Sequence, residues 1–343
     1  MLYLTTRNRH DAYTVARVTH GERGADGGLY LPYRMPVFSA QEVAQLKEKS
    51  FGACVADVLN TFFSCRLTDR EVDYLIGKNA VKFAEPGHRV VAAESWHNEG
   101  WDYGWLQQRL AERICPDVPP TGWTRIGVRI AVLTGIFGQL MRMGITDGCS
   151  SVDIAVPAGD FEIPMSCWYA RQMGLPVGYI LCGCNENAAA WDLMHLGNLR
   201  TDAITVKTTT PEADCAVPEH LERLICAVLG PEEALHYSEV CRRGGNYQLV
   251  GPQLEALRTG MFAAVISKDR LNTLVHSFYR TCGYILGPYT ALGYGAMLDY
   301  RGKTGENRPC LLLAEKCPSQ DATVVCSAMD LTLRQLQEKL NQI

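Results

Sequence analysis

Residues Val152 to Leu181 read VDIAVPAGDFEIPMSCWYARQMGLPVGYIL, and this stretch decides the fold class. An apolar strand is followed by a turn that contains Gly159, then by a helix and a second apolar strand. This order is typical of one β-α-β unit of a parallel sheet. Strands and helices continue to alternate up to a C-terminal helix expected from Thr332. The sequence therefore predicts an α/β protein with a mostly parallel, doubly wound sheet.

The composition is typical of a folded protein and has no excess of positive charge. The chain has 343 residues, of which 47% are hydrophobic, so it can bury a full core. Its formal net charge is -4, and we therefore expect no nucleic-acid partner. The longest uncharged apolar stretch, Ile130 to Leu140, is too short to span a bilayer, and the first residues lack an apolar leader. We expect a cytoplasmic protein with no membrane contact.

The cysteines and histidines do not form a metal motif in the sequence. Fourteen cysteines are scattered without a Cys-x-x-Cys pair, and no two histidines have HxxxH spacing. Cys182 and Cys184 end an expected buried strand, where packed thiols are favoured over a zinc site. Cys167 and His195 lack the flanking signature of a nucleophile and its base, and Cys167 is expected on an apolar helix beside Trp168. We expect no metal and a packed Cys167 thiol.

Three regions follow from the pattern of helices, prolines and aromatic residues. Residues 1–83 are expected to form a small α-rich N-terminal domain, and residues 84–123 an irregular aromatic connector with one short helix from about Trp105 to Ile114. Residues 124–343 are expected to form the α/β core. The core begins with an amphipathic helix, and Arg125 and Arg129 are placed off its apolar face.

Three tryptophans of the connector need a partner because large aromatic side chains are costly to leave exposed. Trp96, Trp101 and Trp105 are expected to cover a cleft at the sheet as a plug. The alternative is a subunit contact, since exposed aromatic patches mark interfaces.

The turn after the first strand of the β-α-β unit is the place where such folds bind anions. Here it presents Asp160 and Glu162 on either side of Phe161. These carboxylates could bind a cation or an amine; alternatively, Asp160 caps the helix and Glu162 complements its dipole. We favour the capping interpretation.

A second group of ligand candidates follows the next strand. Asn185, Glu186 and Asn187 come at the carboxyl end of this strand, where open α/β sheets bind ligands. A simple turn explains them nearly as well.

Several segments together resemble one enzyme family in the same order along the chain. They are Tyr3–Arg7, Gly24–Pro32, Val156–Phe161, Met173–Pro176, Asn185–Asn187, Asp214 with Leu221–Leu224, and Gly287–Ala291. These segments resemble the threonine synthases, which are pyridoxal-phosphate (PLP) enzymes of fold type II that convert phosphohomoserine to threonine. The matches extend over about three quarters of the chain, and together they are far more specific than one glycine motif. The resemblance implies a type II PLP-enzyme fold with an N-terminal domain.

The departures from that family affect the cofactor site that the resemblance implies. The family's Schiff-base lysine lies in a Phe-Lys-Asp turn, whereas none of the nine lysines here follows a phenylalanine, and residues 84–123 contain no lysine. The submodule that carries this lysine is therefore expected to be missing, which leaves a truncated core. Neither Lys268, expected in an exposed first turn, nor Lys316, nearer to the cleft, is assigned a catalytic role.

Two positions that the resemblance places against the cofactor have also changed. The degenerate phosphate loop is Gly159, Asp160, Phe161 and Glu162, where Glu162 replaces a glycine and the nearby Pro164 removes an amide donor. Glu315 stands where the family has the residue that faces the pyridine nitrogen, and we favour a salt bridge or a surface role for it.

These observations predict a threonine synthase-like protein without catalytic residues and without PLP. It is expected to bind a small metabolite or a protein partner, with a homodimer as one form of the latter. One alternative is an active PLP-dependent lyase of the threonine synthase type. The other is a PLP-independent enzyme that uses carboxylates in the remaining cleft.

Overall fold

The computed structural model of the chain describes residues 1–77, 80–97, 102–116 and 118–342. Its centre is a six-stranded sheet in which neighbouring strands are parallel except at one edge, where β4 runs antiparallel to β5. The predicted α/β class with a mostly parallel sheet is confirmed. In spatial order the strands are β10 (Met261–Val265), β7 (Val177–Cys184), β6 (Val152–Pro157), β11 (Cys310–Ala314), β5 (Val90–Glu94) and β4 (Lys82–Gly87).

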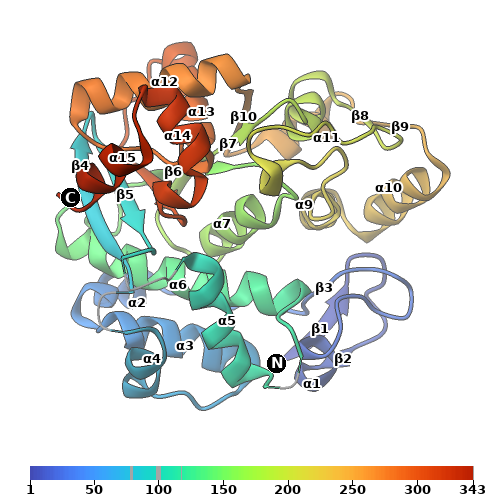
Figure 1. Cartoon of the computed structure of the whole chain (residues 1–343). Coiled ribbons are helices and arrows are strands. Elements are labelled where there is room, and N and C mark those ends of the chain that lie inside the picture. The colour runs from blue at the N-terminus through green and yellow to red at the C-terminus, as the bar shows by residue number, and fades with distance from the viewer. Residues whose placement is uncertain (78–79, 98–101, 117, 343) are drawn as a thin grey trace.

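Helices cover both faces of this sheet (Figure 1). Successive residues of a strand point to opposite faces, and Val91 and Ala93 accordingly belong to one hydrophobic cluster, whereas Val90 and Ala92 belong to the other. The first cluster includes α6 (Gly122–Arg142) and α7 (Glu162–Gln172). The second includes α12 (Lys268–Cys282), α13 (Pro288–Thr304), α14 (Ala322–Met329) and α15 (Leu333–Leu340).

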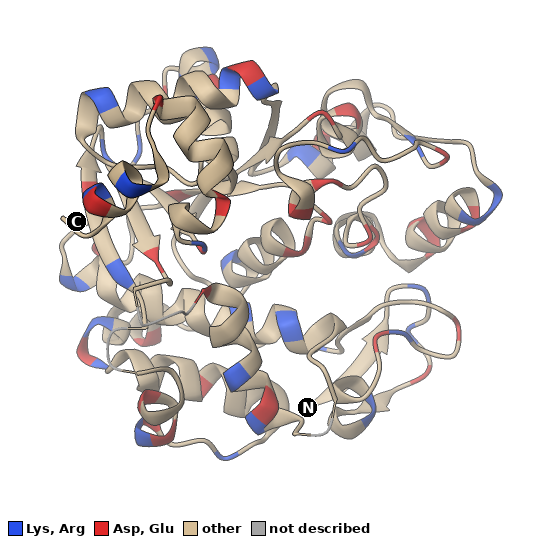
Figure 2. Ribbon diagram, in the orientation of Figure 1, with Lys and Arg blue, Asp and Glu red and all other residues tan. Residues whose placement is uncertain are grey.

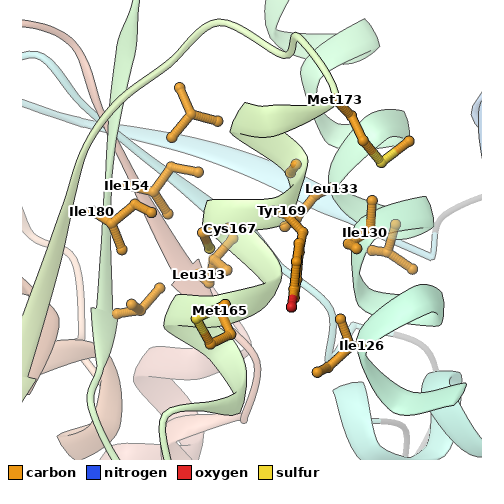
Figure 3. Packing of buried hydrophobic residues seen from close by; sticks show 14 of the residues in the cluster. Ile126, Ile130, Leu133, Ile154, Met165, Cys167, Tyr169, Met173, Ile180 and Leu313 are labelled. Carbon is orange, nitrogen blue, oxygen red and sulfur yellow. The ribbon is translucent and has the colours of Figure 1, made fainter. Parts of the chain in front are cut away.

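Helix α7 lies between α6 and the sheet (Figure 3). Its buried side chains include Met165, Cys167 and Tyr169, and these pack among Ile130 of α6 and Ile154 of β6. The predicted β-α-β unit is thereby confirmed, with β6 and β7 parallel and joined through α7. This packing fixes the turn between β6 and α7 at the carboxyl edge of the sheet.

The N-terminal region combines a small antiparallel sheet with helices that pack on α6. The sheet has the order β2-β1-β3. The Tyr3 hydroxyl donates to the carbonyl oxygen of Phe62 over 2.6 Å, which ties the sheet to α3. Ser39 and Thr68 form capping boxes at the starts of α2 and α4. The elements are β1 (Leu2–Thr5), β2 (Tyr13–Thr14), α1 (Val15–Thr19), β3 (Tyr30–Pro32), α2 (Ala40–Gln45), η1 (Leu46–Glu48), α3 (Phe51–Phe63) and α4 (Asp69–Ile76).

The prediction of an irregular connector over 84–123 is wrong for its first part. This part forms the β4–β5 hairpin, and β5 pairs in parallel with β11 inside the main sheet. The predicted helix is confirmed as α5 (Tyr103–Ile114). The hairpin turns at His88 and Arg89, which both have φ 56°, and neither residue type is a usual signal for such a turn.

The segment between β7 and β10 was only partly predicted. The sequence pattern predicts a helix over residues 247–259, but Tyr247 lies in the short strand β9 and the helix begins only at Pro252. Helix α10 was not predicted. Within the described ranges, no helix is both long and apolar enough to cross a membrane. The other elements are α8 (Ala189–Trp191), η2 (Asp192–Leu196), β8 (Asn198–Arg200), η3 (Pro211–Ala213), α9 (Leu221–Leu229), α10 (Pro231–Arg243), β9 (Asn246–Gln248), α11 (Pro252–Arg258) and η4 (Pro318–Asp321).

Candidate functional site

A cavity of about 500 Å³ lies at the carboxyl edge of the sheet, and we call it the cleft. Its walls come from the β6–α7 turn, α5, α6, the start of α13 and the residues that follow β11. Helix α13 starts at the cleft and approaches the sheet closely: a Cβ atom on Gly183 would lie 2.1 Å from the carbonyl oxygen of Leu292. The charged lining residues are Asp102, Arg125, Arg129, Asp160, Glu162, Glu212, Glu315, Lys316 and Asp321.

Arg129 joins two carboxylates in one wall of the cleft. Its side chain is 5% exposed; Nη1 contacts the Glu315 carboxylate, and Nη2 lies 3.6 Å from Oε1 of Glu162. One helical turn earlier on α6, Nε of Arg125 lies 2.7 Å from Oε2 of Glu162. Tyr103 supplies a ring face 4.1 Å from the Arg129 guanidinium. This ion cluster connects α6, α7 and the end of β11.

Burial sets the electrostatics of this cluster. It raises the pKa of the Glu162 carboxyl, although Arg129 and Arg125 act in the opposite direction. It also raises the pKa of Glu315, against the effect of Arg129. Burial alone would lower the pKa of Arg129, but Glu315 and Glu162 outweigh it and leave that pKa above its usual value. The guanidinium is therefore the fixed charge around which the two carboxylates are arranged.

Asp160 makes a hydrogen bond at the start of α7 and also lines the cleft. Its Oδ1 accepts the backbone N–H of Glu162 over 3.0 Å, which is the predicted capping contact at the start of α7. Its side chain is 48% exposed and lines the cleft, and Oδ2 lies 4.0 Å from Nε2 of His220. One carboxylate oxygen thus caps the helix, while the other lies on the side of His220.

Asp160, Glu162 and His220 bring three candidate metal-ligand atoms within 4.8 Å of one another. However, Nε of Arg223 donates to Nδ1 of His220 over 3.0 Å. Burial and neighbouring arginines lower the pKa of His220 well below its usual value, so the ring is neutral and carries its proton on Nε2. A metal ligand needs that nitrogen unprotonated, and Glu162 already faces two arginines. The arrangement does not suit a metal ion.

The second set of ligand candidates lies outside the cleft walls. Nδ2 of Asn185 donates to Oδ1 of Asp214 over 2.8 Å, and Nδ2 of Asn187 lies 3.4 Å from the same oxygen. Both asparagines are buried. Glu186 accepts the backbone N–H of Lys268 at the start of α12. The structure therefore places these three residues in loop-fixing contacts and does not bring them to Asp160 and Glu162.

Of the two lysines considered, only Lys316 lines the cleft. Its Nζ pairs with the Glu212 carboxylate and lies 5.0 Å from the centre of the Tyr289 ring. Lys268 is an exposed residue in the first turn of α12, as predicted.

The other candidates from the sequence are placed away from the cleft walls. Cys167 is fully buried in the core that Figure 3 shows, which confirms a packed thiol, and burial raises its pKa to about 12. His195 instead stacks on Trp191. Among the described residues, the cleft walls include neither Trp96 nor Trp105, so a plug by these two is not what the structure shows. Trp101, the third residue of the expected plug, lies outside the described residues.

Five cleft residues were missed or undervalued by the sequence: Arg125, Arg129, Tyr103, Glu212 and Tyr289. Arg125 and Arg129 were placed off the apolar face of α6, and the structure shows that Arg129 is nevertheless buried. The available signal was the spacing of two arginines four residues apart on an otherwise apolar helix.

The β6–α7 turn and Glu315 have partners within the chain. The N–H of Glu162 donates to Asp160, and the Glu162 carboxylate is buried at the helix N-terminus. Glu315, which the sequence resemblance aligns with the residue that faces the pyridine nitrogen, is paired with Arg129. The described cleft walls contain one lysine, Lys316, and it is paired with Glu212.

Comparisons with known proteins agree with the resemblance seen in the sequence. The family model described as "Threonine synthase N terminus" matches residues 2–79. "Threonine synthase-like 1" of Homo sapiens is 26% identical over 175 residues, which are 50% of this chain and 23% of that protein. Threonine synthase of Pseudomonas aeruginosa is 24% identical over 238 residues, which are 68% of this chain and 48% of the relative. The matched region is thus about a quarter of the length of the threonine synthase-like 1 proteins.

Solved structures show the same fold. A PLP-bound threonine synthase from Brucella melitensis has a TM-score of 0.82 at 17% identity, covering 96% of this chain and 91% of that one. Threonine synthase from yeast has a TM-score of 0.78 at 14% identity, and the match covers 99% of this chain and 94% of the yeast chain. At these identities the likeness concerns the fold alone. The chain is therefore similar to the threonine synthases: residues 2–79 match the model of their N-terminal region, and the whole chain has their fold.

Proposed function

We propose that this threonine synthase-like protein performs no PLP chemistry and instead binds a small metabolite in the cleft. The observation that carries the proposal is the ion cluster of Glu162, Arg129 and Glu315. It places side chains of this chain at two positions that the resemblance assigns to the cofactor. A bound phosphate would have to displace or neutralise the Glu162 carboxylate. The free-energy cost of this step is larger in a poorly hydrated site, because charges interact more strongly there than in water.

The lysine content supports the same proposal. Schiff-base chemistry needs an amine that is free to attack an aldehyde. Residues 84–123 contain no lysine, and Lys316 in the cleft is held by Glu212 and lies over Tyr289. An ammonium group in an ion pair is not a nucleophile, so the contacts of Lys316 favour a structural role.

Absorbance spectroscopy tests the proposal. The purified protein is mixed with PLP and compared with its Lys316→Ala variant, which shows how much of any reaction comes from surface lysines. We expect the two spectra to be the same, with no saturable Schiff-base band. A band that saturates at one PLP per chain and disappears in Lys316→Ala would overturn the proposal.

A second candidate function, a PLP-dependent lyase of the threonine synthase type, is favoured by one observation. Lys316 lines the cleft and could reach a bound aldehyde if Glu212 released it. The same spectra decide between the two candidates, because only the lyase requires Lys316 to form the Schiff base.

A PLP-independent enzyme that uses Asp160 and Glu162 together has weaker support. Glu162 faces Arg125 and Arg129, which leaves Asp160 as the only member of that pair with an exposed carboxylate. General acid-base work by two carboxylates requires both to reach the substrate.

We also propose a cytoplasmic role with no nucleic-acid or membrane partner. Figure 2 shows Lys and Arg interspersed with Asp and Glu over the ribbon, and the formal net charge is -4. A protein partner, including a second copy of the chain, remains compatible with this surface. Light scattering of the purified protein measures whether it is a monomer or a dimer.

A further inference from the structure

A second, much smaller cavity adjoins the cleft, and we call it the inner cavity. Tyr103, Arg129, Leu313 and Glu315 line both spaces and form the boundary between them. The volume of the inner cavity is about 10 Å³, which is near the smallest space that holds one water molecule, so a metabolite does not fit there. Its other lining residues are Val81, Ala93, Ser95, Val132, Leu133 and Ile136.

Three polar atoms of the residues around the inner cavity are buried without a hydrogen-bond partner among the described residues. They are Oγ of Ser95, Oη of Tyr103 and Nε of Arg129. All three residues are buried, so bulk solvent does not satisfy these atoms. Buried polar atoms in folded proteins are nearly always paired, either with protein or with an ordered water molecule. Three unpaired atoms on the residues of one small cavity therefore point to a molecule that bonds to them.

Backbone hydrogen bonds bring these residues together at the end of β11. The N–H of Ser95 donates to the carbonyl oxygen of Ala314 over 3.2 Å, and the N–H of Tyr103 donates to that of Glu315 over 2.9 Å. Arg129 contacts the Glu315 carboxylate through Nη1, and its guanidinium lies 4.1 Å from the centre of the Tyr103 ring. The residue after β5, the start of α5 and the middle of α6 thus meet on two consecutive residues.

We propose that the inner cavity holds one ordered water molecule, which is bonded to Ser95, Tyr103 and Arg129. The Nε–H group of Arg129 can only donate, whereas each hydroxyl can donate or accept. A water molecule can accept from Nε and donate to both hydroxyls, which gives all three atoms a partner. A small ion matches less well, because the walls carry both the Arg129 guanidinium and the Glu315 carboxylate.

This water completes the set of partners around Arg129. Nη1 and Nη2 of the guanidinium are directed to Glu315 and Glu162, and the water takes the third donor group, Nε–H. The water is thereby a member of the ion cluster and helps to fix the position of Arg129. The inference does not depend on the proposed function, because it concerns the side of Arg129 that faces the inner cavity.

A crystal structure of the full chain, at a resolution that shows ordered water, tests the inference directly. We expect one density peak in the inner cavity, within hydrogen-bond distance of at least two of the three atoms. An empty cavity would overturn the inference. Direct hydrogen bonds among Ser95, Tyr103 and Arg129 that leave no atom for a water would overturn it as well.

Chemical denaturation of Tyr103→Phe and Ser95→Ala provides a second test, in which the sign of the effect decides. If the water is present, each variant removes one of its partners, and the denaturant midpoint should fall. Without the water, each variant removes an unpaired buried hydroxyl, and the midpoint would stay the same or rise. Phenylalanine keeps the ring face beside Arg129. Tyr74→Phe, at an exposed residue, is the matched control and should leave the midpoint unchanged.

The double variant shows whether both hydroxyls bond to the same water. In that case the fall in midpoint for Ser95→Ala combined with Tyr103→Phe should be smaller than the sum of the two single falls. Additive falls, or an unchanged or raised midpoint in either single variant, would overturn the inference. None of these results depends on PLP, so the absorbance spectra with PLP decide the proposed function separately.

Discussion

The Nε atom of Arg125 lies 2.7 Å from the Oε2 atom of Glu162, so a side chain of α6 meets the first residue of α7 at the edge of the cleft. One turn later on α6, Arg129 extends this contact to Glu315 at the end of β11. The two arginines are not equivalent, because the side chain of Arg125 is 43% exposed and that of Arg129 is 5% exposed. Stability measurements on variants of the two can therefore separate a buried ion cluster from a surface pair.

Arg129→Ala should lower the free energy of unfolding by about 3–5 kcal/mol, since it leaves the buried Glu162 and the partly buried Glu315 without their shared cation. The matched control is Arg125→Gln, which removes the solvent-exposed arginine and should cost about 1 kcal/mol or less. Chemical denaturation of both variants provides the comparison. Equal losses would mean that the buried cluster contributes no more than a surface ion pair.

The stability that Glu162 contributes should depend on pH in a defined direction. Burial raises its pKa above 4.5, so the folded state holds the proton more tightly than the unfolded chain. This contribution is fully present below about pH 4.5 and is lost as the pH rises through the raised pKa. Glu162→Gln, which resembles the protonated form, should therefore gain stability relative to the unaltered chain between pH 4.5 and 7. The opposite trend would show that Arg125 and Arg129 dominate over burial.

Arg7→Ala should destabilise the contact between the N-terminal sheet and α9. Nε and Nη2 of Arg7 donate to the two oxygens of Glu222 over 2.9 and 2.8 Å, and Glu222 is 4% exposed. Losing this charged pair should cost about 1.5–3 kcal/mol. Arg23→Ala removes an exposed pair with Glu219 and should cost about 1 kcal/mol or less. A loss for Arg7→Ala no larger than that control would contradict the structural role of the pair.

Asn185→Ala should lower stability by about 1–3 kcal/mol and leave binding in the cleft unchanged. The reason is that Asn185 fixes a loop through Asp214 and does not line the cleft. Chemical denaturation and ligand titration of the same variant measure both quantities. If the variant has normal stability but no longer binds ligand, Asn185 belongs to the ligand site.

The sequence predicted the parts of the fold that follow from local patterns. The β-α-β unit and the helix near Trp105 to Ile114 follow from local periodicity, and the structure confirms them. The β4–β5 hairpin was missed because its turn places His88 and Arg89 at positive φ, where the usual hairpin signal is Asn-Gly or Asp-Gly. The adjacent Pro86 and Gly87 also suggested a break in regular structure.

The sequence predicted residues of the candidate site only where they lie close together in one segment. Asp160 and Glu162 lie two residues apart, and the structure places both at the cleft. Their partners Arg129 and His220 come from distant segments, and such pairings depend on how the helices pack. The role of Asn185 and Asn187 likewise depended on Asp214, about thirty residues further on, which no local rule connects to them.

The most direct measurement of the central claim is borohydride reduction of the protein with one equivalent of PLP, followed by peptide mass analysis. If the ion cluster and the pairing of Lys316 with Glu212 exclude Schiff-base formation, Lys316 stays unmodified and the exposed Lys268 reacts at least as much. Stoichiometric pyridoxyl modification confined to Lys316 would contradict the account.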